Sequence, residues 1–261
     1  MGDFGLIGAW LLLAVVIVSG VIIAVGSVLI ASRIIARDAR PEHNSILSPF
    51  LTVVGLIYGA VLGFTVVVGW QQYLSAETNV ATEASILKTM YRQTVAMPQP
   101  EQSEVRAQIR KYATAMQGPE WGKNEFGNIS NDGRAALTAM YRIVGSGKPS
   151  DATSAINQPF LSQLTELSTI RSARILDAKP RIPPLLWCAL VFGGFVLIAL
   201  TSFMRLADNR AHIILVSAVT MLLALLLYLI FVLDHPFGPM GVTPQPFSEA
   251  FVVFDLVDQG T

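Results

Sequence analysis

Four charged side chains stand at spacings that could bring them together. Glu77 and Glu83 follow the second apolar stretch of the chain, and Arg171 and Arg174 lie one helical turn apart before the third. If antiparallel helices carry them, counting residues back from the third stretch puts Arg174 level with Glu77 and Arg171 nearer Glu83. Such groups can form a structural ion pair that satisfies buried charge, or a charged vestibule that binds or selects ions. Both interpretations stay open at this point.

A second set of polar side chains recurs every seven residues, at Tyr58, Thr65, Gln72 and Asn79. Polar groups that recur along one line of a membrane-spanning helix can line water, so these four are the candidates for a pore. The alternative is that Tyr58 and Thr65 hydrogen-bond to neighbouring helices, while Gln72 and Asn79 are simply solvated.

Both sets depend on one long helix, which we expect over residues 52–91. Its sequence begins as a membrane span and continues without a proline or glycine after Gly69. About forty helical residues reach roughly 60 Å, which is twice the hydrocarbon thickness of a bilayer. The helix should therefore leave the membrane and enter a water-exposed helical domain.

One face of this helix has the alternating four- and three-residue spacing of a packed seam. In the membrane its members are Gly55, Gly59 and Gly63, a pattern that lets a neighbouring backbone approach closely. Beyond the membrane the seam becomes aromatic and aliphatic, as burial from water requires. Glu77 also falls in the seam, and a buried carboxylate needs a partner, for which we expect Arg174.

Composition places the chain in a membrane. Of its 261 residues, 52% are hydrophobic and 14% are charged, against about 25% charged residues in soluble domains. Four segments are long and apolar enough to span a bilayer, at about 6–31, 47–70, 185–204 and 211–233. No strand signal appears, so the predicted fold is all-α, with four transmembrane helices and an extramembrane helical bundle formed by extensions of the second and third spans. The predicted parts are a first transmembrane helix pair at 1–70, the helical domain at 71–184, a second pair at 185–233 and a tail at 234–261.

The helical domain should be a bundle whose helices each bury one apolar face. The predicted faces are Val105, Ile109, Tyr112 and Met116, then Leu137, Met140, Tyr141 and Val144, and, in a helix at about 159–178, Phe160, Leu164 and Leu167. The tail places Phe247, Phe251 and Phe254 on one helical side with acidic residues around them. Acidic rather than basic surroundings favour docking on protein over lying at the membrane surface.

Arginines in the short loops predict the orientation. These residues are Arg33, Arg37, Arg40, Arg205 and Arg210, and the terminal tails hold no lysine or arginine. Positive residues favour the cytoplasm, so we expect a multi-pass protein of a bacterial inner membrane with the helical domain on the extracytoplasmic side. The opposing evidence is the basic cluster close before the third span, at Arg171, Arg174, Lys179 and Arg181.

Several function classes find no support in the sequence. The formal net charge is zero and no basic stripe is present, which argues against a nucleic-acid partner. No histidines and cysteines stand at metal-ligand spacing, and no nucleophile, phosphate-loop or dinucleotide motif occurs. We therefore expect no enzyme, no cofactor and no metal site.

Five segments taken together are similar to one known family. They are YGAVLGFTVVVGWQQYLSAETNVATEASILKTMYR at 58–92, EW at 120–121, RSARI at 171–175, IPPLLW at 182–187 and LDHPFGPMGVTPQPF at 233–247. They resemble the bestrophin-like domain family, which consists of mostly bacterial four-span membrane proteins. The resemblance runs from the second span to the C-terminus.

The resemblance implies kinship to bestrophins, which are homopentameric anion channels with a pore lined by the second span and its continuation. The bestrophin neck uses bulky apolar residues, for which Val54, Tyr58 and Phe64 are available here. No acidic cluster matches the bestrophin calcium clasp. In bestrophins both termini and the helical domain are cytosolic, which is opposite to the orientation predicted from the arginines.

The leading hypothesis is an oligomeric, bestrophin-like anion channel with the second span nearest the pore. Its partners would be the lipid bilayer, inorganic ions and further copies of the chain, as a pentamer by the resemblance. The alternative is a non-conducting membrane sensor or scaffold whose helical domain binds a ligand or a protein partner.

Overall fold

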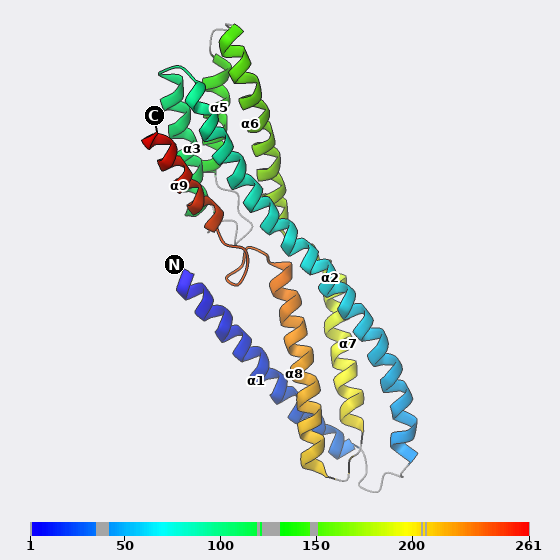
Figure 1. The fold of residues 1–261 in the computed structure, drawn as a ribbon. Coiled ribbons are helices and arrows are strands. Elements are labelled where there is room, and N and C mark those ends of the chain that lie inside the picture. The colour runs from blue at the N-terminus through cyan, green and yellow to red at the C-terminus, as the bar shows by residue number, and fades with distance from the viewer. Residues whose placement is uncertain are drawn as a thin grey trace. The chain divides into compact units, whose positions relative to one another are not determined.

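The computed structural model describes residues 2–34, 42–118, 121, 131–146, 151–204, 206 and 208–260. Within these ranges the chain is helical and contains no strand, which confirms the all-α prediction (Figure 1). The elements are α1 (Gly2–Ile34), α2 (Glu42–Gln93), the 3₁₀ turn η1 (Thr94–Ala96), α3 (Glu101–Gln117), α5 (Asn131–Ser146), α6 (Asp151–Asp177), α7 (Pro184–Phe203), α8 (Asn209–Asp234) and α9 (Gln245–Gln259). Arg37, Arg40 and Arg205, which enter the orientation argument, lie outside the described residues.

Four helices of the described chain are long and apolar enough to cross a membrane. Their spans are Trp10–Arg33, Asn44–Ala96, Pro184–Phe203 and Asn209–Asp234. The prediction of a four-span membrane protein is therefore confirmed. The second span is much longer than a bilayer needs, because α2 runs unbroken for 52 residues, about 78 Å of helix.

The chain forms two compact units that α2 shares. Unit 1 comprises Met1–Gln71 and Pro180–Asp234, and unit 2 comprises Gln72–Lys179 and His235–Thr261. The boundaries thus fall at 71/72 and 179/180, where the sequence suggested 70/71 and 184/185. The tail belongs to unit 2 instead of forming a part of its own.

In unit 1, α1 packs on α8 at a close crossing. A Cβ placed on Gly20 would lie 3.5 Å from the Ala224 Cβ, so the glycine lets the two helices approach. Beyond the crossing, Ala24, Val28 and Val216 form a small buried cluster. Toward its N-terminus α1 leans away from α7 and α8 (Figure 1).

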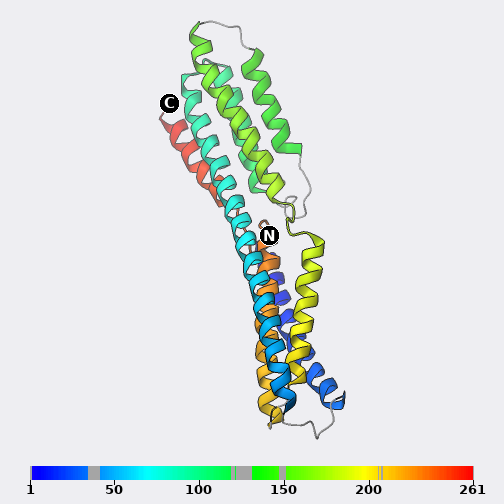
Figure 2. The same ribbon diagram turned by 90° about the vertical axis from the view of Figure 1, so that its right-hand side faces the viewer.

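Unit 2 has one hydrophobic core, built by the later part of α2 with α3, α5, α6 and α9. The predicted buried faces are confirmed, apart from Tyr141, which is exposed. The tail helix α9 buries Phe247, Ala250 and Phe254 completely, and lies beside the last turns of α2 (Figure 2). The prediction that the tail docks on protein is therefore confirmed.

The segment between α6 and α7 differs from the prediction. Residues 178–183 are not helical, so α7 is a separate helix and only the second span extends into the bundle. Pro180, Pro183 and Pro184 explain the break, because proline lacks the N–H that a helix needs and disfavours helical geometry before it. At its other end α6 begins at Asp151, eight residues before the predicted start at Pro159. The helix therefore contains this proline in its interior.

Candidate functional site

A buried ion pair lies in the core of unit 2. The Arg174 Nε donates a hydrogen bond of 2.7 Å to the Glu83 Oε2, and both side chains are fully buried. The Tyr112 hydroxyl donates to the other oxygen of Glu83 at 2.5 Å. Burial and the charge of Glu83 raise the pKa of Tyr112 well above its ordinary value, so the phenol stays protonated. Arg171, one turn from Arg174, is buried as well.

The predicted pairing of Arg174 with Glu77 is wrong. Glu77 is exposed, and the buried line of α2 runs through Ala76, Val80 and Glu83 instead. The residue count assumed a helix up to the third span. However, residues 178–183 are not helical, and a non-helical chain advances about twice as far per residue as a helix. Arg174 therefore lies farther along α2 from the third span than a continuous helix would place it, and it contacts Glu83.

This geometry favours the structural interpretation of the charges. Neither partner is open to solvent, so an ion could bind only by displacing one of them. A buried pair of this kind satisfies its own charges, and loss of one partner leaves the other uncompensated. The charged vestibule of the second interpretation is therefore not formed by Glu83 and Arg174.

The polar stripe of α2, which consists of Tyr58, Thr65, Gln72 and Asn79, faces other parts of the same chain. In unit 1 the Tyr58 hydroxyl donates to the Leu190 carbonyl at 2.9 Å, and Thr65 is buried with its hydroxyl donating to the Val61 carbonyl. The Tyr58 ring fills the space beside Gly193, where an added Cβ would lie 2.6 Å from the ring. Tyr58 thus bonds to a neighbouring helix, which was the alternative to lining a pore.

The other two members of the stripe bind the end of α6 in unit 2. The Gln72 Nε2 donates to the Lys179 carbonyl at 3.3 Å, and the Asn79 Nδ2 donates to the Asp177 Oδ2 at 2.7 Å. Asp177 is almost fully buried. Neither side chain is merely solvated, and in the single chain none of the four stripe residues lies on an open face. These contacts within the chain favour the packing alternative for the four residues, and the pore-lining role stays a prediction.

The predicted packing glycines lie on an open face instead. A Cβ added at Gly59 or Gly63 would meet no described atom within 4 Å, and one at Gly55 would meet only Leu197 at 3.8 Å. The glycine of α2 that another helix approaches closely is Gly69, where an added Cβ would lie 3.0 Å from the Leu233 Cβ. Within the described chain, no helix is therefore packed on Gly59 or Gly63.

The outward face of α2 was missed by the sequence analysis. In unit 1 it carries Leu56, Ala60 and Phe64 at spacings of four, and both Leu56 and Phe64 are 74% exposed. Of the three predicted neck residues, only Phe64 lies on this line. In unit 2 the exposed side of α2 carries Thr78, Ser85 and Arg92 at spacings of seven. That spacing is visible in the sequence and could have been weighed beside the first stripe.

Comparison with known proteins identifies the family. The profile of the Bestrophin-like domain matches residues 19–247. The chain belongs to the bestrophin-like domain family. No curated protein matches the sequence.

Solved structures share the fold of this bestrophin-like protein. One is a mutant of a bacterial bestrophin homolog from Klebsiella pneumoniae, with a TM-score of 0.67 and 14% identity over 93% of this chain and 98% of that chain. Another, described as a membrane protein, has a TM-score of 0.66 and 13% identity over 95% of this chain and 97% of that chain. At such identities the similarity concerns the fold.

A buried carboxylate fastens the α6–α7 connection of the bestrophin-like chain to α8. The Asp234 Oδ1 accepts hydrogen bonds from the backbone N–H groups of Arg181 and Ile182, at 2.9 and 3.1 Å. Its Oδ2 accepts one from the Trp187 indole at 3.2 Å. Asp234 therefore holds the turn that precedes the third span, and we assign it a structural role. Among the described residues no group of three or more His, Cys, Asp or Glu could hold a metal.

An exposed charge cluster holds α9 to α2 and α3 in unit 2. Asp258 accepts hydrogen bonds from the Tyr91 hydroxyl, Arg106 and Arg110 at 2.7–2.9 Å, and Arg110 also binds Asp255. Burial alone would raise the pKa of Asp258. The hydrogen bonds from Tyr91 and Arg110, with the charges of Arg110 and Arg106, outweigh burial and lower the pKa below its ordinary value. The cluster therefore couples tail docking to the ionisation of Asp258.

Proposed function

We propose that this protein is an oligomeric anion channel of the inner membrane, with the outward face of α2 lining the pore. The observation that carries the proposal is the division of α2 into two sides. Tyr58, Thr65, Gln72 and Asn79 turn toward the chain itself, while the side with Leu56 and Phe64 is left open. Membership of the bestrophin-like family supports the same choice, because the pore of bestrophins is lined by the second span.

The two parts of the open side suit different steps of conduction. The line Leu56, Ala60 and Phe64 in unit 1 is apolar, and a ring of such side chains forms a hydrophobic constriction that can gate by dewetting. In unit 2, Thr78 and Ser85 offer hydroxyl groups and Arg92 offers a positive charge. Hydroxyl donors and a cationic side chain attract anions without binding them tightly.

Assembly into a ring would bring copies of α2 around one axis. Identical subunits commonly form closed cyclic oligomers, and the family resemblance suggests five copies. The open space beside Gly59 and Gly63 supports this arrangement, because a neighbouring helix can approach a glycine face closely. The surfaces beside these glycines are then the proposed contact with the next subunit.

The side of the membrane on which unit 2 lies needs its own experiment. The short-loop arginines favour a helical domain outside the cytoplasm, whereas the resemblance to bestrophins favours one inside it. We retain the arginine-based side as the prediction. A C-terminal alkaline phosphatase fusion should then be active in bacteria, and a matching green fluorescent protein fusion should be dark. The reverse pattern would establish the cytosolic side.

Anion flux into liposomes tests the channel proposal. The purified oligomer should conduct chloride, and Phe64→Ala should raise the conductance several-fold because it widens the proposed constriction. The matched control is Phe192→Ala on α7, since Phe192 is 71% exposed and lies outside the proposed pore. Well-folded oligomers that pass no ions would overturn the proposal and favour the non-conducting sensor or scaffold.

A further inference from the structure

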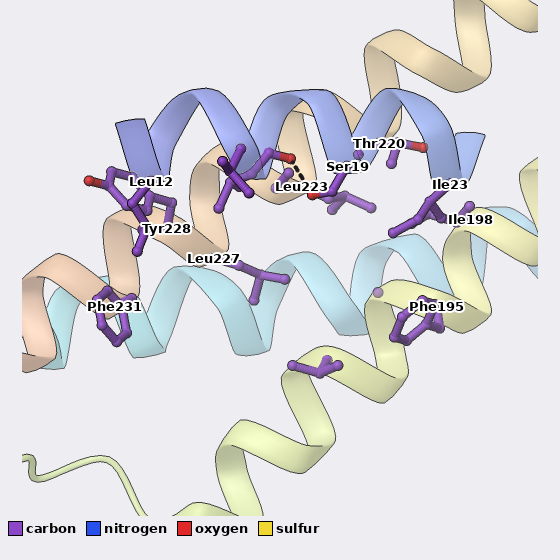
Figure 3. A pocket seen from close by; sticks show the side chains of 16 residues that line it. Leu12, Ser19, Ile23, Phe195, Ile198, Thr220, Leu223, Leu227, Tyr228 and Phe231 are labelled. Atoms are coloured by element: carbon purple, nitrogen blue, oxygen red, sulfur yellow. Dashed lines mark hydrogen bonds between the residues drawn. The ribbon is translucent and has the colours of Figure 1, made fainter. Parts of the chain in front are cut away.

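A groove of about 520 Å³ lies in unit 1 between α1, α7 and α8. Figure 3 shows Leu12 and Ile23 of α1 on one side and Leu227 and Phe231 of α8 on the other. Phe195 and Ile198 of α7 complete the lining (Figure 3). The anion-channel proposal assigns no role to this groove.

The groove exists because α1 and α8 touch at one crossing and diverge beyond it. At the crossing Gly20 approaches Thr220 and Ala224, and farther along Ser27 hydrogen-bonds to Ser202 at 2.7 Å. Toward the N-terminus of α1, the side chains of Leu11, Leu12 and Val15 are exposed, with Val15 at 65%. The space between the diverging helices is therefore a wedge that is closed at the crossing and open outward.

The lining selects an apolar occupant. The Ser19 hydroxyl donates to the Val16 carbonyl at 3.0 Å, and the Thr220 hydroxyl donates to the Val216 carbonyl at 2.8 Å, so both hydrogens are used within their own helices. No charged residue lines the groove, and Tyr228 at one end is the third hydroxyl. An apolar cavity does not hold water, since water needs two to four polar partners.

The shape of the groove decides between the two apolar candidates, a lipid chain and a helix of a neighbouring subunit. A helix with its side chains is about 10–12 Å across. It cannot enter the narrow end of the wedge, where a Cβ on Gly20 would lie 3.5 Å from the Ala224 Cβ and both residues line the groove. A lipid chain is slim and flexible, and lipid hydrocarbon surrounds these helices, because α1, α7 and α8 are all membrane spans.

We propose that this groove is a lipid site that holds one acyl chain of a membrane phospholipid between α1 and the α7–α8 pair. Dispersion contacts with the lining stabilise the chain there, because an empty groove would leave the lining side chains without partner atoms on one side. The bound chain then sets the angle at which α1 leaves α8. The site is independent of whether the protein conducts ions.

Native mass spectrometry of the full-length protein tests the proposal. The protein, purified with long-chain phosphatidylethanolamine and exchanged into detergent, should retain about one lipid per chain. Leu227→Trp fills the groove and should reduce retention about tenfold. The control is Leu222→Trp, because Leu222 lies on the same helix, is 58% exposed and does not line the groove. Equal retention by the two variants, or no retained lipid in the wild type, overturns the site.

A second measurement uses the unaltered protein and therefore does not depend on folding of a variant. A phosphatidylethanolamine with a diazirine in the middle of one acyl chain is cross-linked to the protein in liposomes. Cross-links should concentrate on the peptides of α1 and α8 that line the groove, and long-chain but not short-chain phospholipid should compete. Uniform labelling of all spans would mean that only the surrounding lipid had been detected, and would refute the proposal.

Discussion

Arg174 donates through its Nε to the Oε2 of Glu83 at 2.7 Å, and both side chains are fully buried in the core of unit 2. The pair joins α6 to α2, and the Tyr112 hydroxyl adds α3 to the same carboxylate. Three helices of the bundle therefore meet at one buried charge. Because water cannot replace a lost partner there, the stability of unit 2 depends on all three groups.

Removing the carboxylate should destabilise the protein strongly. Glu83→Ala leaves the Arg174 charge buried and uncompensated, which costs about 3–5 kcal/mol. Thermal unfolding of the purified protein in detergent should show the loss. Glu77→Ala is the matched control on the same helix, since Glu77 is exposed, and it should change stability by less than about 0.5 kcal/mol. Similar losses in both variants would contradict the assigned pairing.

The tail helix should detach in acid. The pKa of Asp258 is lower in the folded protein than in the unfolded chain, so its contribution is complete above the unfolded pKa of about 4. It is lost as the pH falls through the lower folded pKa. A pH-insensitive dye on Val252→Cys, in a Cys188→Ser background, should lose anisotropy over that range as α9 gains mobility.

Two variants identify the group responsible for this acid transition. Asp258→Asn should give the low anisotropy already at neutral pH, because the amide cannot form the ion pairs with Arg106 and Arg110. Glu249→Gln, an exposed position on the same helix, should follow the unaltered protein. An unchanged acid transition in Asp258→Asn would assign the coupling to another carboxylate.

Tyr58 should matter for packing and not for conduction. Tyr58→Phe removes the hydrogen bond to the Leu190 carbonyl, which should cost about 1 kcal/mol because the acceptor is buried. Chloride flux and ion selectivity in liposomes should stay unchanged, since the hydroxyl points toward α7. A large change of conductance with unchanged stability would contradict this prediction and indicate that Tyr58 lines the pore.

The periodic spacing of apolar residues correctly predicted the helices and the faces that they bury. The spans, the long helix α2 that continues beyond its span, and the buried faces of α3 and α6 follow from apolar spacing alone. The partners of the polar stripe could not be predicted in the same way, because Tyr58 and Gln72 bind the backbone carbonyls of Leu190 and Lys179. Every residue has a carbonyl, so such an acceptor leaves no trace in the sequence.

The register of α6 against α2 and the open face of α2 could not be predicted from the sequence, for other physical reasons. Pairing Arg174 with Glu83 required knowing that residues 178–183 are not helical, and an error of a few residues changes which carboxylate lies opposite. Within the membrane, lipid and protein core are equally apolar, so Leu56 and Phe64 have the composition of buried residues although both are exposed.

Arg92 should set the preference of the proposed channel for anions. It is exposed on α2, and a unit charge about 8 Å from an ion in water contributes about 0.5 kcal/mol, reduced by salt. Arg92→Glu reverses this contribution once in every subunit of the ring. The chloride-to-sodium permeability ratio, measured from reversal potentials across planar bilayers, should therefore fall several-fold.

The control for this effect is Arg142→Glu, an equal charge reversal at an exposed position of α5. It changes the net charge of the oligomer by the same amount but is not on α2. If selectivity followed net charge alone, both variants would shift the reversal potential equally. The proposed pore face requires the shift to be confined to Arg92→Glu, with a further increase in cation preference as the ionic strength is lowered, because the screening of the introduced carboxylates then weakens.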